Sequence, residues 1–592
     1  MTGQRSSGVS DAVVLALLGL ALAVAGGVWL WGELAGGLFG GGWPSISSGQ
    51  LPQVIARLPG RLADPASAWP GRARALLPGP AGCYAALGLM LALAAGPVAG
   101  AARLGLRRQR RPDRGARWAA AGELRPLRGS GRRGSGRARA HGRRRSGGAP
   151  TSGGRLALGR SGGRLLHAEE RHALVAFGPP QSGKSAGLAV PALLEWDGPA
   201  VASSIKTDLL ACTLQRRQEL GEVMVFDPFE LSGAPAHTWS PLRGAATWDG
   251  ALEVAWRLAA AGELDQRGVD GGDFWAIAAE QRLAPLLYTA SRTGAGMGDV
   301  VRWTYGQGSR ELYEAISQLT GSARDEEELE GAHAAYDALR AFESQADRTR
   351  SSIEATAQGL LRAYRFARVL RSARSSDIAP DRLLDERATL YLIGDAKASK
   401  LLRPIFLALL SEIVDRAYER ATLAGGRLEL PLLLCLDEAG NVAPLPNLAE
   451  VASTAPSHNI QLVSIFHDLA QARSRYGRQA ETVVNSHRAR MLLPGVADLD
   501  TLRYFSGLAG EEEARELTRT SGAGGASRTT GVRRRPLIAP EALRQLRPGN
   551  ALLLYGSIPP AEIRLRMWFA DRRLRRLAAG ADREAAAPKA DA

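Results

Sequence analysis

The segment Leu174–Val190 constrains the fold of this 592-residue chain more than any other. It opens with four apolar residues, LVAF, which predict a short buried strand, and continues as GPPQSGKS, which fits G-x-x-x-x-G-K-[ST]. An apolar helical pattern follows. Glycines let backbone N–H groups turn toward one centre, and the start of a helix adds its positive dipole end. The segment therefore predicts a phosphate-binding loop between a strand and a helix.

A chance glycine-rich turn is the alternative interpretation of this loop. The chain has only five lysines, so an accidental match would arise in roughly one such sequence in a hundred. In a functional loop, Lys184 would reach the β and γ phosphates as a point charge, and the Ser185 hydroxyl would hold Mg²⁺. The predicted cofactors are ATP and Mg²⁺. The residues predicted to bind the nucleotide are Gly178, Pro179, Pro180, Gln181, Ser182, Gly183, Lys184 and Ser185.

The segment Pro431–Glu438, PLLLCLDE, is the second landmark. A buried apolar strand delivers two carboxylates at its carboxyl end, which is where open parallel sheets bind their ligands. Asp437 is predicted to hold the hydration shell of Mg²⁺, and Glu438 is predicted to orient the attacking water. A strand that ends in two solvated acids is the common alternative, but the phosphate-binding loop favours the catalytic interpretation.

Another apolar strand, Ile460–Phe466, ends at His467. The strand that follows the carboxylate pair in such a sheet ends beside the γ-phosphate, so a polar side chain there can sense it. His467 is therefore a candidate catalytic residue. A structural hydrogen bond is an equally good interpretation of a lone histidine at a strand end.

Further apolar strands are predicted at Pro199–Ile205, Val223–Phe226 and Ala388–Ile393, alternating with helical patterns. Alternation of this kind predicts an α/β fold with a parallel sheet covered on both faces. From about residue 245 the apolar period is helical and strand signals are few. The segment 245–385 is therefore predicted to form an inserted all-α domain.

Two uncharged stretches, Ala12–Trp31 and Ala81–Ala102, are each about long enough to cross a bilayer as a helix. A cleaved signal peptide is the alternative for the first stretch, but the second favours a transmembrane hairpin. The loop between them has few arginines, whereas Arg103–Arg145 holds sixteen arginines against Asp113 and Glu123. The positive-inside rule then places both termini, and with them the predicted nucleotide-binding domain, on the cytoplasmic side of the cell membrane.

The basic segment after the hairpin accounts for most of the chain's charge. Sixteen arginines less two acids give +14 of the chain's +16, so the remainder is close to neutral and its bulk charge does not indicate DNA binding. The segment has too few large apolar residues to bury a core, and lipid headgroups are favoured over DNA phosphates as its contact.

The chain is predicted to divide into six parts. They are a hairpin with an extracytoplasmic loop (1–102), a basic flexible linker (103–163), a P-loop motor domain in two parts (164–244 and 386–575), the all-α domain (245–385) and a disordered tail (576–592).

With these motifs in place, the chain resembles the type IV secretion coupling proteins of the TraG/TraD family. The resemblance rests on the order of several motifs, namely the two N-terminal stretches, GPPQSGKS, KTD at Lys206–Asp208, DPF at Asp227–Phe229, FW at Phe274 and Trp275, CLDEAGN at Cys435–Asn441, and PGNALLLYGSIPP at Pro548–Pro560. It implies a RecA-like P-loop NTPase core with an all-α domain, assembled as a homo-hexamer around a channel. It also implies transfer of single-stranded DNA with its relaxase, and channel proteins of the secretion system as partners.

The chain departs from this family at two positions. Members usually carry glutamine where His467 stands. Many also carry an arginine just before that strand, which reaches the nucleotide of the neighbouring subunit, whereas this chain has PSHN at Pro456–Asn459. Arg488 or Arg490 is a candidate replacement.

Three functions are compatible with the sequence. The first is an ATP-driven DNA-transfer motor. The second is a docking receptor that selects substrates through the helical domain and uses ATP for assembly. The third is an FtsK-like translocase, which predicts additional membrane spans and a C-terminal winged-helix module, and neither is visible in the sequence.

The segment Thr520–Arg535 is predicted to be a mobile loop before the closing strand Ala551–Tyr555.

Overall fold

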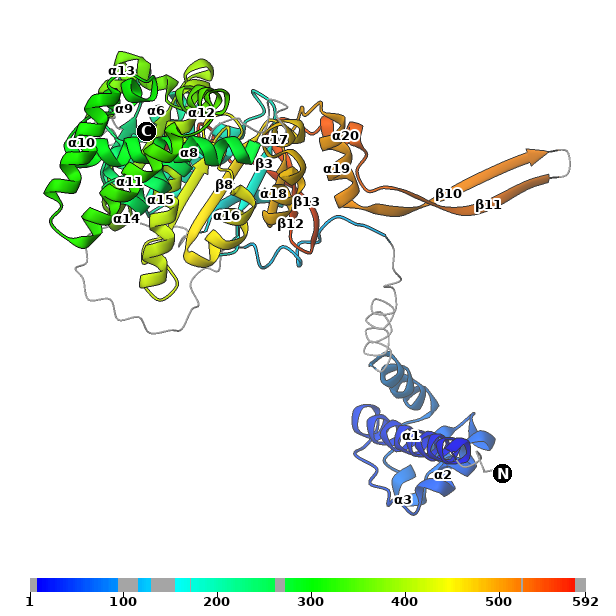
Figure 1. Cartoon of the computed structure of the whole chain (residues 1–592). Coiled ribbons are helices and arrows are strands. Elements are labelled where there is room, and N and C mark those ends of the chain that lie inside the picture. Colours follow the sequence, from blue (N-terminus) through cyan, green and yellow to red (C-terminus); the bar gives the residue numbers. More distant parts are fainter. Residues whose placement is uncertain are drawn as a thin grey trace, which may run out of the picture. The chain divides into compact units, whose positions relative to one another are not determined.

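The computed structural model describes residues 8–93, 115–128, 155–170, 172–260, 272–522 and 525–580. The chain divides into two compact units, Met1–Arg114 and Gly115–Ala592. The first holds the N-terminal helices, and the second holds the sheet and every predicted site residue (Figure 1).

Helix α1, Gly8–Phe39, dominates the N-terminal unit. Its stretch Leu22–Phe39 is long and apolar enough to cross a membrane, and it is the one such helix in the described part of the chain. Of the second predicted span the structure describes only the residues up to 93, and these belong to an apolar helix described over Pro80–Leu93. Residues 94–102 lie outside the described residues. The described residues therefore provide one candidate membrane helix, and the second predicted span stays a prediction.

The segment between these two helices packs into a small core. Trp31 of α1 donates a hydrogen bond from Nε1 to the carbonyl oxygen of Cys83 at 2.7 Å, and its ring meets that of Trp69 edge-on at 5.7 Å. Buried apolar side chains such as Val54 fill the space around the two rings. The short helices of this segment are α2 (Leu51–Arg57), η1 (Leu58–Arg61), η2 (Pro65–Ala68) and α3 (Gly71–Arg74).

An eleven-stranded sheet organises the second unit, in the order β2-β1-β13-β12-β9-β3-β8-β7-β4-β6-β5. Neighbouring strands from β9 to β5 pair in parallel, which confirms the predicted α/β class, and the other four pair antiparallel. The strands are β1 (Ala157–Ser161), β2 (Arg164–His167), β3 (Leu174–Phe177), β4 (Ala200–Ser204), β5 (Val223–Phe226), β6 (Thr389–Ile393), β7 (Leu432–Leu436), β8 (Ile460–Phe466), β9 (Ala489–Leu492), β12 (Asn550–Tyr555) and β13 (Ile558–Arg564).

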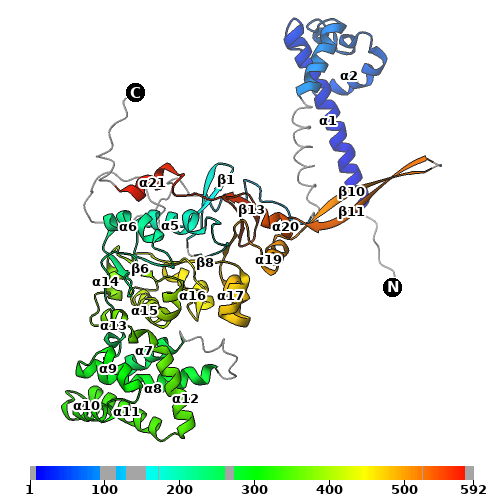
Figure 2. The ribbon, with the colours of Figure 1, turned by 90° about the horizontal axis from the view of Figure 1, so that it is seen from above.

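Both faces of the sheet are covered, as the continuous apolar strands predict. Along β3, Leu174 packs into one buried apolar cluster with residues of α5, and Val175 packs into a second with residues of α15. Figure 2 shows α5 and α6 on one side of the sheet and α15, α16 and α17 on the other. The helices of these layers are α5 (Val190–Glu195), α6 (Asp208–Leu220), α15 (Ala396–Leu423), α16 (Leu448–Thr454), α17 (Leu469–Tyr476), α18 (Ala480–Ser486) and α19 (Leu499–Ala509), with the short turns η7 (Ala455–His458) and η8 (Gly477–Gln479).

The described chain between β5 and β6 contains helices and no strand, in line with the helical period of its sequence. They are η4 (Pro241–Arg243), α7 (Trp248–Ala260), α8 (Gly272–Thr293), α9 (Met297–Thr304), α10 (Ser309–Ser322), α11 (Glu326–Glu343), α12 (Asp347–Leu360), η6 (Arg362–Arg365), α13 (Ala367–Arg371) and α14 (Pro380–Asp385). Helices α7 to α12 lie together beyond α15 in Figure 2, whereas α13 and α14 lie beside α15.

The folded unit begins earlier than the composition of the basic segment indicates. Strand β1 lies inside the predicted flexible linker, and residues 115–128 also pack on the sheet. The backbone N–H of Ala119 donates to the carbonyl oxygen of Pro560 at 2.8 Å, and Leu124 and Leu127 are buried. These contacts join residues far apart in the chain, so the local composition gave no signal of them.

The prediction of a loop at Thr520–Arg535 is wrong. Two long antiparallel strands, β10 (Glu511–Gly522) and β11 (Gly525–Pro536), form a hairpin that extends away from the sheet (Figure 1). The ladder pairs Glu511 with Pro536 and Gly522 with Gly525. Backbone hydrogen bonds between the paired residues form this ladder, so a polar sequence without apolar alternation can adopt it.

The chain end also differs from its prediction. Helix α20 (Pro540–Arg544) precedes β12, and helix α21 (Arg572–Ala579) continues four residues into the predicted disordered tail. The Asp571 side chain caps α21 by accepting hydrogen bonds from the N–H groups of Arg573 and Leu574. Residues 581–592 lie outside the described residues.

His487, between α18 and β9, makes the stability of the fold sensitive to acid. It is fully buried beside Ser464, and burial lowers its pKa to about 4 from the ordinary 6.5. The unfolded chain binds this proton below pH 6.5, whereas the folded chain binds it only near pH 4. The free energy of unfolding should therefore fall by about 3 kcal/mol as the pH falls through this window. His487→Gln should flatten that slope in denaturant titrations, and an unchanged slope would contradict the assignment.

Candidate nucleotide-binding site

The phosphate-binding loop connects β3 to a turn of π-helix, Ser185–Ala189, that continues as α5. Gly183 has φ of +89°, and a Cβ there would lie 2.6 Å from Cε of Met567. The backbone conformation therefore favours glycine, and a larger residue would also have to displace the end of the Met567 side chain. The segment around Met567 supports the loop from outside, because the backbone N–H of Trp568 donates to Ala186 at 3.0 Å. No local sequence pattern indicates this support.

The strand order brings the predicted site residues together. Strand β8 lies between β3 and β7, so the ends of these parallel strands place the loop, His467 and the Asp437–Glu438 pair at one edge. At the loop tip Pro180 and Gln181 are exposed and Pro179 is half-buried, while Gly178 and Ser182 are buried.

Lys184 and Glu438 form the central contact of the site. Nζ of Lys184 lies 2.8 Å from Oε1 of Glu438, and both side chains are less than a tenth exposed. Nζ also lies 3.4 Å from the carbonyl oxygen of Gly178. The lysine is thus directed into the mouth of the loop, where its charge is balanced by a carboxylate.

Asp437 lies beside the hydroxyl group of Ser185, the residue that begins the helical turn after the phosphate-binding loop. Oγ of Ser185 donates to Oδ2 of Asp437 at 2.6 Å, while Oδ1 is buried and has no hydrogen-bond partner among the described residues. Burial raises the pKa of Asp437 to about 6, although the Ser185 hydrogen bond and the Lys184 charge oppose the rise. An unpaired buried carboxylate oxygen next to a hydroxyl is the hard oxygen donor set that Mg²⁺ binds. The residues present therefore fit this ion.

Glu438 is held ionised in a strained backbone conformation. Burial alone would raise its pKa, but hydrogen bonds from His467 and Lys184 outweigh burial and lower the pKa to about 2. Its φ of +64° lies in the left-handed region that non-glycine residues avoid, and such strain gathers at functional sites. Nδ2 of Asn441 donates to Oε2 at 2.8 Å, a contact that the strand pattern did not predict.

His467 is directed at the same carboxylate. Its Nε2 lies 2.7 Å from Oε2 of Glu438, and its Nδ1 lies 3.4 Å from Nζ of Lys184. Its backbone N–H donates to Oε1 of Gln471 at 2.7 Å, which fixes the strand end. The imidazole thus has a hydrogen-bonding role in the described chain, and the partner is the residue predicted to orient water.

Neither candidate replacement arginine reaches this site within its own chain. Arg490 lies opposite Val175 in the β9–β3 pairing and donates to the carbonyl oxygens of Val484 and Asn485. Arg488 precedes β9 and lies 3.6 Å from Glu169. In parallel strands these positions lie toward the amino edge, away from the phosphate-binding loop.

On the predicted catalytic role of His467, its replacement with alanine should lower the predicted ATP hydrolysis by about tenfold, because Glu438 loses one of the groups that orient it. His467→Gln should restore part of the rate, since an amide can still donate to the carboxylate. Steady-state hydrolysis by both variants measures the effect. Equal rates for wild type and His467→Ala would show that the imidazole only supports the fold.

The family comparison matches residues 136–590 to the model described as "Type IV secretory system Conjugative DNA transfer". Among the relatives, the Escherichia coli "Conjugal transfer protein TraG" is 27% identical over 431 residues, which cover 67% of this chain and 65% of the relative. "Protein VirD4" from Agrobacterium fabrum is 23% identical over 421 residues, which cover 70% of this chain and 61% of the relative. The matches thus span just under two thirds of these relatives' lengths.

Solved structures show the same fold. The "Bacterial conjugative coupling protein TrwBdeltaN70" has a TM-score of 0.54 at 17% identity, covering 77% of this chain and 93% of that chain. A structure of TrwB "in complex with ADP and Mg2+" has a TM-score of 0.52, covering 77% of this chain and 94% of that one. Since the family model spans most of the sequence, the chain belongs to the type IV secretion coupling proteins of conjugative DNA transfer.

Proposed function

We propose that this chain is a membrane-anchored ATPase that couples ATP binding and hydrolysis to the recruitment and transfer of single-stranded DNA through a type IV secretion channel. The observation that carries the proposal is the cluster of Lys184, Ser185, Asp437 and Glu438 at the carboxyl edge of the sheet. Its contacts pair a phosphate-binding cation with a water-orienting carboxylate, and a hydroxyl with a second carboxylate, which is the arrangement that phosphoryl transfer requires.

Each residue has a role that follows from its contacts. Lys184 would leave Glu438 for the phosphates, since the two anions compete for one ammonium group. Ser185 and Asp437 would hold Mg²⁺, which neutralises phosphate charge when it is bound. Glu438, released from the lysine but still held by Asn441 and His467, would orient the attacking water.

The same proposal includes the larger assembly. A RecA-like core with the helical segment as a separate all-α domain, a homo-hexamer around a channel, and a two-helix membrane hairpin with the motor in the cytoplasm all follow from the family. Helix α1 and the names of the relatives support this assignment. A relaxase carrying the DNA and the channel proteins of the secretion system are the proposed partners.

A docking receptor with little hydrolysis is the second candidate. It is favoured by the contacts of Glu438, which engages Lys184 and His467, and by the distance of Arg488 and Arg490 from the site. In this account ATP binding supports assembly, and the helical segment selects the substrate.

ATP hydrolysis by the full-length protein in detergent, measured alone and with single- or double-stranded DNA, distinguishes the two candidates. Stimulation by DNA is the result expected of the motor. Binding of MgATP without hydrolysis under all three conditions would replace the motor with the receptor. A shorter fragment should start at Gly115 rather than within 129–163, because Leu124 and Leu127 belong to the folded core.

A further inference from the structure

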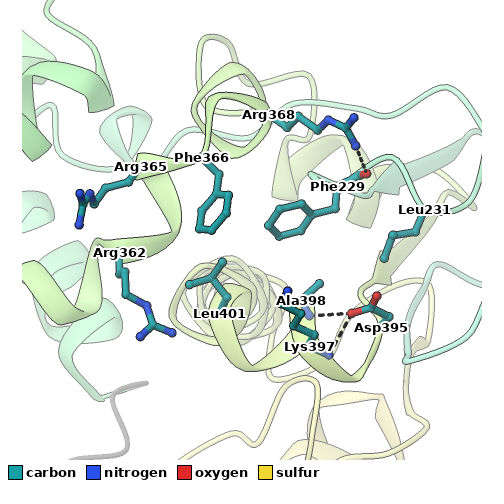
Figure 3. Close-up of a pocket in the computed structure, with 10 residues that line it drawn as sticks. All are labelled: Phe229, Leu231, Arg362, Arg365, Phe366, Arg368, Asp395, Lys397, Ala398 and Leu401. Carbon is teal, nitrogen blue, oxygen red and sulfur yellow. Dashed lines mark hydrogen bonds between the residues drawn. The ribbon is translucent and has the colours of Figure 1, made fainter.

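A pocket of about 660 Å³ lies at the carboxyl edge of the sheet, where the loop after β5 and the first turns of α15 meet the segment from η6 to α13. Figure 3 shows side chains from these three places turned toward one space. We call it the arginine–phenylalanine pocket, and it is lined by Phe229, Phe366, Arg362, Arg365, Arg368 and Lys397. Its volume is in the range of small-ligand sites.

The loop after β5 is built to hold Phe229 in place. Buried Asp227 accepts a hydrogen bond at Oδ2 from the N–H of Ser232 at 2.7 Å, which closes a turn across the loop. Within the turn, Glu230 has φ of +59°, and its N–H donates to Asp227 at 2.9 Å. A strained, hydrogen-bonded turn holds its side chains in place before a ligand binds, so that binding does not have to order the loop. The DPF motif noted in the sequence thus acts as a structural support for an aromatic wall.

The two phenylalanines leave a ring face open. Their centroids lie 5.7 Å apart at an interplanar angle of 74°, and Phe366 remains 49% exposed. Figure 3 shows the two rings next to each other, with Leu401 below them. A half-exposed ring beside a cavity is a surface on which a planar group can stack.

Cations surround these rings. The one carboxylate among the lining residues, Asp395, accepts hydrogen bonds from the N–H groups that begin α15. Arg368 donates to the carbonyl oxygen of Phe229 at 3.3 Å, and Arg365 lies over the ring of Tyr305. The side chains of Arg362 and Lys397 have no hydrogen-bond or ion-pair partner in the part of the chain that the structure describes, and both are exposed. The pocket therefore carries positive charge available to an anion.

We infer that the arginine–phenylalanine pocket binds single-stranded nucleic acid. A base would stack on Phe366, and the flanking phosphates would contact Arg362 and Lys397. Stacking surfaces combined with a basic groove bind single strands without regard to sequence. The inference rests on the proposed function, for which it names a contact site of the transferred strand.

An acidic protein segment is a weaker match to these features. Carboxylates would pair with the cations, but they would leave the exposed Phe366 ring in water. Double-stranded DNA hides its base faces, so it could use the cations and not the ring. A single strand satisfies both features at once.

The pocket is connected to the nucleotide site through one helix. Lys397 and Leu401 stand in the first turns of α15, and Arg403 of the same helix donates to the carbonyl oxygen of Asn441 at 3.4 Å. Asn441 in turn donates to Glu438. A nucleic-acid strand bound in the pocket would therefore contact the helix that is linked through Asn441 to Glu438. Binding of the strand should for this reason stimulate ATP hydrolysis.

The test is fluorescence anisotropy of a labelled oligothymidylate with the full-length protein in detergent, at several salt concentrations. Phe366→Ala should weaken binding about tenfold, and Lys397→Glu should weaken it and reduce the salt dependence by about one phosphate contact. Lys400→Glu is the matched control, because it makes the same charge change three residues along α15 outside the pocket lining. It should bind as wild type does. Thermal melting establishes that each variant is folded.

Wild-type binding by folded Phe366→Ala and Lys397→Glu would overturn the pocket assignment. So would polyglutamate that displaces the probe as well as unlabelled oligothymidylate does, because an acidic protein would then be the better ligand. MgATP binding by the wild type is measured in the same preparation. Its absence would defeat the proposed function, whereas its presence with unaffected pocket variants defeats only this inference.

Discussion

Replacing Glu438 with glutamine should abolish most ATP hydrolysis and leave nucleotide binding intact. The amide keeps the shape of the side chain but loses the negative charge that orients the attacking water, and loss of a residue that prepares the nucleophile lowers rates by about 100-fold to 10,000-fold. The variant should bind MgATP at least as tightly as wild type does, because the carboxylate no longer competes with the phosphates for Lys184. Steady-state hydrolysis and calorimetric titration with MgATP measure the two effects.

The matched control is Glu450→Gln, which makes the same change on the exposed surface of α16. It should hydrolyse ATP at the wild-type rate. Conjugative transfer should fall with hydrolysis in Glu438→Gln and not in the control. Transfer at wild-type frequency by Glu438→Gln would contradict the motor assignment.

Replacing Lys184 with alanine should weaken MgATP binding by on the order of 100-fold, because a buried cation that faces the phosphates is removed. The substitution also removes one of the groups that hold Glu438 ionised, so the pKa of Glu438 should rise. Fluorescence of a labelled ATP analogue titrated with protein measures the binding. Lys400→Ala, on the exposed surface of α15, should leave the affinity unchanged.

Local sequence patterns were sufficient for the strands that form the catalytic edge. The segments Leu174–Phe177 and Ile460–Phe466 are continuous apolar runs because both of their faces are buried, and the structure places strands at these residues. Their parallel pairing could be anticipated from the alternation of strands and helices, whereas β9, the other neighbour of β3, was not predicted.

Elements that depend on distant partners could not be predicted in this way. Residues 115–128 fold because their backbone and side chains meet the sheet, as in the hydrogen bond from Ala119 to Pro560. The β10–β11 hairpin is held by a ladder of backbone hydrogen bonds. Neither contact leaves a period of apolar residues in the sequence.

In the candidate site, too, some residues could be predicted from local sequence and others depend on the folded chain. Lys184, Ser185, Asp437 and Glu438 follow from motif spacing, because each directly continues a predicted strand or loop. Asn441 contacts Glu438 only because the chain turns sharply after β7, with Glu438 in a left-handed conformation. A turn of this kind is set by packing and is not evident from residue type.

A structure of the chain with Mg²⁺ and a non-hydrolysable ATP analogue tests the central claim most directly. The account predicts the γ-phosphate against Nζ of Lys184, Mg²⁺ between Ser185 and Asp437, and Glu438 separated from the lysine that it contacts at 2.8 Å without nucleotide. An analogue bound elsewhere, with the Lys184–Glu438 ion pair intact, would contradict it.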